Sequence, residues 1–131
     1  MNARPMKKII VDTSIWIEFL KKNPKIFPSV QVLLEKNNAI ALGCIFGELL
    51  QGAKSERERK IILSYWQYLP KIDNADIWID AGIYSGKNKF ISKGNGLIDS
   101  LIITAAINNG FIVWTLDKKL QSVMTDEISY Q

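Results

Sequence analysis

The amino-acid sequence predicts an α/β fold in which helices cover both faces of a central, mostly parallel sheet. Short β-branched runs alternate with longer amphipathic stretches, the order expected of parallel strands joined by crossover helices. The chain has 131 residues, of which 47% are hydrophobic, enough to build one core. Because no repeat, low-complexity segment or long linker interrupts it, we expect a single domain over residues 1–131.

The first expected elements are a strand and two helices. Residues 7–12 form a β-branched run that ends in an acid, which indicates a buried strand. Thr13 and Ser14 are suited to begin a helix, and Asn23-Pro24 ends it. A second helix is expected after Pro28.

The middle of the chain predicts a second strand and two more helices. Residues 39–42 form the strand, and Gly43 marks a break before a helix over residues 44–52. A capping box of the form Ser-x-x-Glu at residues 55–58 starts the next helix, which runs up to Pro70.

The rest of the chain predicts three helices and two strands. Apolar residues recur at helical spacing over residues 73–90, and residues 97–108 are apolar almost all round, as in a buried helix. Residues 111–115 form a third buried strand, residues 117–123 a short helix, and residues 128–130 an edge strand.

The residue counts exclude several kinds of functional site. The chain has no histidine and one cysteine, Cys44, which excludes an internal disulfide, a Cys/His zinc site and the usual Ser-His-Asp or Cys-His hydrolase. An enzyme of this composition would work with carboxylates, lysines, hydroxyls or a metal ion. The cysteine content also favours a reducing, cytoplasmic setting.

Charge and hydropathy set bounds on the partners. The 17 basic and 13 acidic residues give a net charge of +4, which permits a polyanion partner without requiring one. Residues 1–8 lack the apolar core of a signal peptide. The longest apolar stretch, residues 97–107, is too short and too interrupted to span a bilayer. We therefore expect a soluble protein with no membrane partner.

Four acidic residues are the candidates for a functional site. Asp12 and Asp117 follow predicted strands, at the sheet edge where ligands of open α/β sheets bind. Glu48 and Asp99 stand in apolar segments, where an ionised carboxylate needs a partner. Taken singly, each has an ordinary explanation. Asp12 and Asp117 would cap helices, Asp99 would interact with a helix dipole, and Glu48 would pair with a lysine.

Taken together, the four acids predict a metal site. No histidine or buried-looking lysine in these segments balances them, so converging carboxylates would repel one another. Mg²⁺ or Mn²⁺ relieves such repulsion and supports phosphoryl chemistry without histidine. The hydroxyls of Thr13, Ser14 and Thr115 flank the strand-end acids and are supporting candidates, although caps and turns explain them equally well.

The acids lie in four motifs that resemble those of PIN-domain nucleases, especially the VapC toxins of prokaryotic toxin–antitoxin pairs. The matching segments, in order, are residues 10–14 (IVDTS), 47–53 (GELLQGA), 96–106 (GLIDSLIITAA) and 115–117 (TLD). The resemblance covers nearly the whole chain. It departs just after the fourth motif, where many members carry a further acid and a phenylalanine and this chain has Lys119 and Leu120.

The resemblance implies an α/β/α sandwich that cuts RNA endonucleolytically with Mg²⁺ or Mn²⁺. Its catalytic and metal-binding residues would be Asp12, Glu48, Asp99 and Asp117. It also implies a homodimer and a small antitoxin that fills the active-site groove. Because Lys119 stands where an acid often does, the fourth corner rests on Asp117 alone, and the choice between one and two metals stays open.

Three other functions compete with an RNA-cutting toxin. A nuclease of the same family could act in RNA processing without a toxin role. A module of the same fold could bind RNA or protein without cutting, but such a module need not tolerate the repulsion of the acids. A phospho-acceptor domain using Asp12 is disfavoured by the position of Glu48 and by the motif at residues 115–117.

Overall fold

The central sheet has four parallel strands in the order β3-β2-β1-β4. The computed structural model describes residues 7–72 and 74–131. Its strands are β1 (Ile9–Val11), β2 (Ala39–Leu42), β3 (Lys71–Ile72) and β4 (Ile112–Trp114). β1 and β2 are buried along their whole length, as expected of strands covered on both faces.

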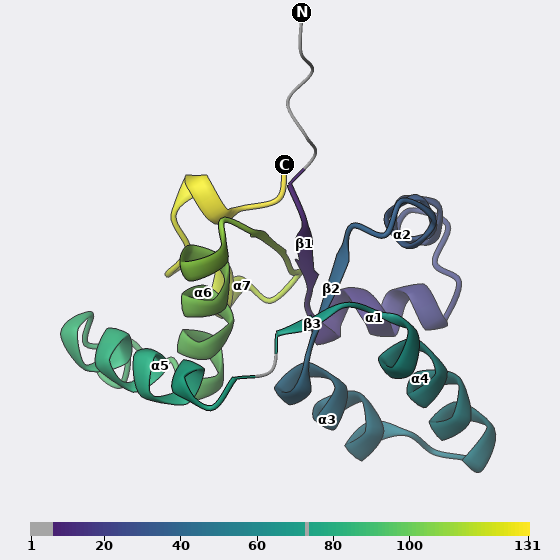
Figure 1. Ribbon diagram of the computed structural model, residues 1–131, viewed down its shortest axis with the longest axis horizontal. Helices are drawn as coiled ribbons and strands as arrows, with labels where there is room; N and C mark the ends of the chain where they lie inside the picture. The colour runs from purple at the N-terminus through teal and green to yellow at the C-terminus, as the bar shows by residue number, and fades with distance from the viewer. Residues whose placement is uncertain (1–6, 73) are drawn as a thin grey trace, which may run out of the picture.

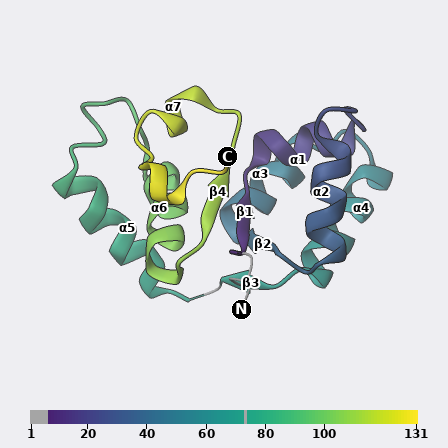
Figure 2. The same cartoon turned by 90° about the horizontal axis from the view of Figure 1, so that it is seen from above.

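Helices lie on both sides of this sheet. They are α1 (Thr13–Leu20), α2 (Phe27–Glu35), α3 (Gly43–Gly52), α4 (Glu56–Tyr68), α5 (Asp76–Lys87), α6 (Leu97–Asn109), α7 (Lys118–Gln121) and the 3₁₀ helix η1 (Asp126–Ile128). In both views α1 to α4 gather on one side of the strands, and α5 to α7 gather on the other (Figures 1 and 2). The α/β/α prediction is confirmed.

The core is continuous from the strands to the helices on both sides. On one side the ring of Trp16 packs against Phe19, Phe46 and Tyr65, with centroids 5.4–5.7 Å apart. On the other side residues 100–106 of α6 are all buried, as its apolar circumference predicts. Burial of such side chains stabilises a fold by about 1.5–3 kcal/mol each before entropy is subtracted. The site is therefore carried by rigid elements.

Most predicted elements form, with boundary shifts of a few residues. Gly43 is the first residue of α3 and not a break before it. Ser55 accepts a hydrogen bond from the backbone amide of Glu58 as predicted, while the Glu58 carboxylate accepts from Lys54. β3 was not predicted, because a strand of two residues shows no periodicity.

The C-terminal segment covers the edge of β4 without forming the predicted edge strand. Ser129 makes a single parallel bridge to Val113, and the Tyr130 backbone amide donates to the Val113 carbonyl at 3.0 Å. The Tyr130 ring stacks on Trp114, with centroids 4.3 Å apart. Two sequence predictions fall partly outside the described residues: the absence of a signal sequence at residues 1–8 and the start of a helix at Asp73. Within the described ranges, every helix is too short or too polar to cross a membrane.

Candidate metal site at the carboxyl edge of the sheet

The sheet brings the ends of β1 and β4 together. Val11 is in register with Trp114, so Asp12 and Thr115, one residue further along each strand, are neighbours. The Asp12 backbone amide donates to the Trp114 carbonyl at 3.0 Å and continues the ladder by one bond. The Asp12 side chain is 8% exposed. A buried carboxylate is therefore fixed at the carboxyl edge, where open α/β sheets bind ligands.

Two hydroxyls hold this carboxylate. Thr115 Oγ1 donates to Asp12 Oδ2 at 2.6 Å, and Ser14 Oγ donates to the same oxygen at 3.2 Å. Each hydroxyl also accepts a backbone amide of the turn after β4, from Asp117 for Thr115 and from Leu116 for Ser14. Hydroxyl bonds to a carboxylate are strong ones. They orient Asp12, and neither of them occupies its other oxygen, Oδ1.

Glu48 faces the same region from α3, the helix that follows β2. Partial desolvation raises the pKa of Glu48, although the side chain is largely exposed, and the charges of Asp12, Asp99 and Asp117 raise it further. One turn earlier, burial and then the charge of Glu48 raise the pKa of the Cys44 thiol to about 11. Three of the acids predicted from the sequence therefore act electrostatically on the fourth, Glu48.

Asp99 and Asp117 belong to elements on the other side of the sheet. Asp99 lies in the first turn of α6, where Asn95 Nδ2 donates to its Oδ2 at 2.9 Å. Asp117 precedes α7, and its Oδ1 accepts the backbone amides of Lys119 and Leu120. Each side chain thus accepts these hydrogen bonds through one oxygen, Oδ2 in Asp99 and Oδ1 in Asp117.

The structural roles expected of the single acids, as helix caps, helix-dipole partners or ion pairs, are found for two of the four. Asp117 is an N-cap and Asp99 is in a first helical turn, as those roles require. The Asp12 side chain makes no capping bond to α1. In residues 7–72 and 74–131 no lysine or arginine lies within ion-pairing distance of Glu48. The single ion pair in these residues joins Arg59 to Glu56. Thr13, the third hydroxyl candidate, does not bond to Asp12 as Ser14 and Thr115 do. Its buried Oγ1 has no hydrogen-bond partner among the described residues.

The donor set fits a hard divalent cation that keeps several of its waters. Its ligands would be carboxylate oxygens, the type that Mg²⁺ and Mn²⁺ take. Among the residues that the structure describes, no three acid or cysteine side chains are gathered closely enough to enclose an ion by themselves. Mg²⁺ is usually held by one or two carboxylates, with waters and substrate phosphates completing its shell. Such a cation would relieve the repulsion that the other three acids exert on Glu48.

Neutralising Glu48 should stabilise the metal-free protein at pH 7. A raised folded-state pKa means that the folded chain holds the proton more tightly, so stability falls as pH rises above 4.5, the ordinary value. Glu48→Gln removes that loss, and thermal unfolding in EDTA should show a higher Tm than the wild type. Glu127→Gln, at an exposed acid in η1 that does not contribute to the pKa shift of Glu48, should leave Tm nearly unchanged. A lower Tm for Glu48→Gln would contradict the repulsion.

Comparison with known proteins identifies the family. Residues 9–124 match the family model described as the PIN domain. The chain belongs to the PIN domain family. This confirms the resemblance drawn from the four acidic motifs. Comparison with curated protein sequences gave no significant match.

Solved structures with the same fold include toxin–antitoxin complexes. VapBC2 from Rickettsia felis, bound to a DNA fragment from its promoter, superposes with a TM-score of 0.69 at 20% identity, covering 94% of this chain and 96% of that one. A toxin–antitoxin complex from Klebsiella pneumoniae gives 0.72 at 14% identity, covering 94% and 100%. VapBC-1 from nontypeable Haemophilus influenzae gives 0.63 at 20% identity, covering 94% and 96%. At these identities the likeness shows a shared fold.

Sequence reasoning missed one residue of this PIN domain. Nothing in the sequence singles out Asn95, which stands between two glycines, yet it is 3% exposed and donates to Asp99. Its second acceptor, the Lys119 carbonyl, is 24 residues away along the chain. An asparagine four residues before an acid at a helix start is a weak signal, and the second contact has no sequence signal at all.

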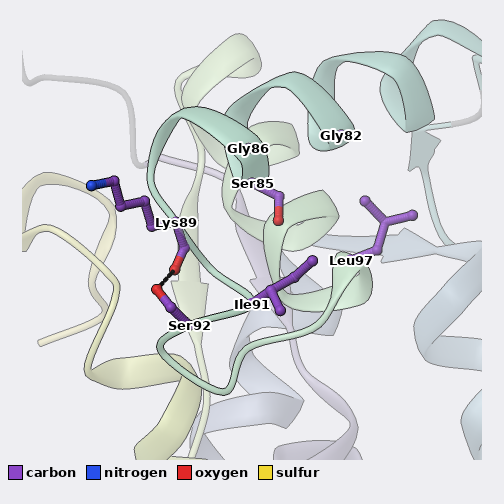
Figure 3. A pocket seen from close by; sticks show the side chains of 7 residues that line it. All are labelled: Gly82, Ser85, Gly86, Lys89, Ile91, Ser92 and Leu97. Carbon is purple, nitrogen blue, oxygen red and sulfur yellow. Dashed lines mark hydrogen bonds between the residues drawn. The ribbon is translucent and has the colours of Figure 1, made fainter.

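Two hollows of this PIN domain differ in whether an acid of the candidate site lines them. One, drawn in Figure 3, is bounded by Gly82, Ser85, Gly86, Lys89, Ile91, Ser92 and Leu97, and none of the four acids lines it. The other is a groove between α1, α3 and α4, lined by Ile17, Leu20, Lys21, Glu48, Leu49, Gly52, Ala53, Lys54, Glu58, Ile61 and Ile62. Because Glu48 lines it, this second groove begins at the acidic site.

Proposed function

We propose that this PIN domain is a Mg²⁺- or Mn²⁺-dependent endoribonuclease and the toxin of a toxin–antitoxin pair. One observation carries the proposal: the buried Asp12 carboxylate is held at the carboxyl edge through Oδ2 by the hydroxyls of Thr115 and Ser14, and neither hydroxyl uses Oδ1. A carboxylate held in this way, with partial desolvation and the charges of three acids raising the pKa of Glu48, suits divalent-metal chemistry on a phosphodiester. The fold shared with toxin–antitoxin complexes supports the toxin role.

Each acid then has a role set by its surroundings. Asp12, held by the hydroxyls of Thr115 and Ser14, would bind the metal through the oxygen that they leave open. Asp99 and Asp117 would complete the site directly or through water. Glu48, the acid with the raised pKa, would ligate the metal or orient the attacking water. When bound, the cation supplies the charge that activates water and stabilises the phosphoryl transition state.

The deciding experiment is cleavage of total cellular RNA with mapping of the new ends. The purified chain should cut in Mg²⁺ or Mn²⁺, lose activity in EDTA and recover it when the metal is restored. An intact RNA pool together with no binding of divalent metal would overturn the proposal. Metal binding without cleavage would favour a binding module of the same fold. Cleavage without growth inhibition in the host would favour RNA processing without a toxin role.

The groove between α1, α3 and α4 supports an antitoxin partner. Its lining is mostly apolar and also includes Lys21, Lys54 and two acids, Glu48 and Glu58. A segment bound there would cover Glu48. The protein encoded by the adjacent reading frame should suppress cleavage when co-expressed. Ile61→Glu puts a charge on the groove lining. It should raise the partner concentration needed to suppress cleavage by at least about tenfold, without lowering cleavage itself. Val32→Glu on α2 is the control, and equal suppression of both variants would refute this docking site.

A homodimer is supported by an apolar face on α5 and the loop after it. Ile79, Ile83 and Ile91 are 65%, 52% and 89% exposed, and Trp78 and Leu97 are also exposed. Contiguous apolar surface of this kind commonly marks a protein interface. Light scattering should show a dimer, and Ile83→Glu should raise its dissociation constant by at least about tenfold. A monomeric wild type, or a dimer unaffected by Ile83→Glu, would contradict this interface.

A further inference from the structure

Asn95 joins two of the acidic motifs through a single side chain. It lies in the loop between α5 and α6 and is 3% exposed. Its Nδ2 donates to Asp99 Oδ2 at 2.9 Å and to the Lys119 carbonyl at 3.1 Å. Asp99 belongs to the start of α6, and Lys119 belongs to α7, which Asp117 caps. One amide therefore connects the segments that carry two candidate metal ligands.

The orientation of this amide follows from its partners. A carboxylate oxygen and a carbonyl oxygen both require a donor, so Nδ2 with its two N–H groups must face them. The other atom, Asn95 Oδ1, is buried and has no hydrogen-bond partner in the described part of the chain. An unpaired buried acceptor destabilises a fold. Since leucine would fill a similar volume without that penalty, packing alone does not explain an amide here.

The loop holds Asn95 rigidly. Its backbone amide donates to the Phe90 carbonyl at 2.9 Å, and Phe90 is itself 1% exposed. Gly94 adopts a φ of +80°, a conformation that L side chains rarely take, and lets the chain turn before α6. The end of the Lys119 side chain lies over Gly94, about 4 Å from where a Cβ would stand. Asn95 is thus fixed from its backbone, from its side chain and from α7.

We propose that Asn95 is a positioning residue of the metal site. It fixes the direction in which Asp99 presents its carboxylate, and it couples that direction to the start of α7 and so to Asp117. The inference rests on the proposed function, because it concerns how well the acids hold a divalent cation. Residues that orient metal ligands in this way typically account for a 10- to 100-fold effect on metal affinity or activity.

The test measures Mn²⁺ affinity by calorimetry and cleavage over a series of Mn²⁺ concentrations. Asn95→Ala removes the donor, and Asn95→Leu removes it while keeping the volume. Both should bind Mn²⁺ at least about tenfold more weakly, and excess Mn²⁺ should restore much of their cleavage. Asn109→Ala is the matched control, because Asn109 Nδ2 donates to the Ala105 carbonyl at the other end of α6. Its Mn²⁺ affinity should stay within about twofold of the wild type.

The outcomes distinguish a failure of the proposed function from a failure of the role inferred for Asn95. If the wild type binds no Mn²⁺, the proposed function fails and the role of Asn95 fails with it. If the wild type binds Mn²⁺ and the folded Asn95 variants bind it equally well, only the Asn95 inference is overturned. A loss of cleavage that excess Mn²⁺ does not restore, at unchanged affinity, would indicate a structural role and overturn the inference as well. Asn95→Ser, whose shorter side chain cannot reach both acceptors, replaces the other two variants if they do not fold.

Discussion

Replacing Asp12 by asparagine should reduce RNA cleavage by more than about a hundredfold, the upper end of the loss typical of residues that only orient a metal ligand. The change removes one negative charge from the only one of the four acids that is almost fully buried. The amide that replaces it is nearly isosteric, so the fold should persist. Removing the charge also lessens the repulsion on Glu48, so the Tm of the metal-free variant should not fall.

The control for Asp12→Asn is Asp126→Asn, an equal change of charge at an exposed position in η1. Initial cleavage rates, Mn²⁺ affinity and Tm should be measured for both proteins. The control should match the wild type in all three. Cleavage by a folded Asp12→Asn variant at the wild-type rate would remove Asp12 from the site and, with it, the centre of the proposed mechanism.

Thr115→Val should lower cleavage by about 10- to 100-fold, because it removes the hydroxyl that orients Asp12. Valine matches threonine in shape but neither donates to Asp12 Oδ2 nor accepts the amide of Asp117. Asp12 would keep the longer bond from Ser14, and Asp117 would lose a tether of its turn. The loss should be visible in both Mn²⁺ affinity and cleavage rate.

Thr115→Ser is the rescue variant, since it restores the hydroxyl without the methyl group. It should recover most of the activity, whereas a purely steric role for Thr115 predicts that valine is the better replacement. Ser14→Ala should have a smaller effect than Thr115→Val, because its bond to Asp12 is 3.2 Å long against 2.6 Å. The reverse ranking would contradict the assignment of Thr115 as the main orienting group.

The parts of this molecule that were predictable from sequence share a local cause. β1 and β4 are short β-branched runs, β2 is a short apolar run, and buried α6 is apolar almost all round, so their own composition determines them. Placing Asp12 and Asp117 at one sheet edge needs only the rule that parallel strands end together. Glu48 and Asp99 were visible because a charge in an apolar segment requires a partner.

What escaped prediction depends on contacts between distant segments. β3 exists because Ala41 and Leu42 pair with Lys71 and Ile72, and two residues carry no pattern of their own. The second contact of Asn95 spans 24 residues. A cap was the ordinary explanation for Asp117, and its Oδ1 does cap α7, but only the fold shows that its charge also raises the pKa of Glu48.

The closure of β4 by the C-terminal segment has a consequence for how copies of this chain can assemble. An open edge strand presents unpaired amides and carbonyls on which a second sheet can grow. Here the Tyr130 backbone amide donates a hydrogen bond to the Val113 carbonyl, and the Tyr130 ring stacks on Trp114. At the opposite edge, β3 has only two residues to offer. Growth of one continuous sheet across two molecules is therefore disfavoured at both edges, so two copies that associate would have to meet through helical surfaces.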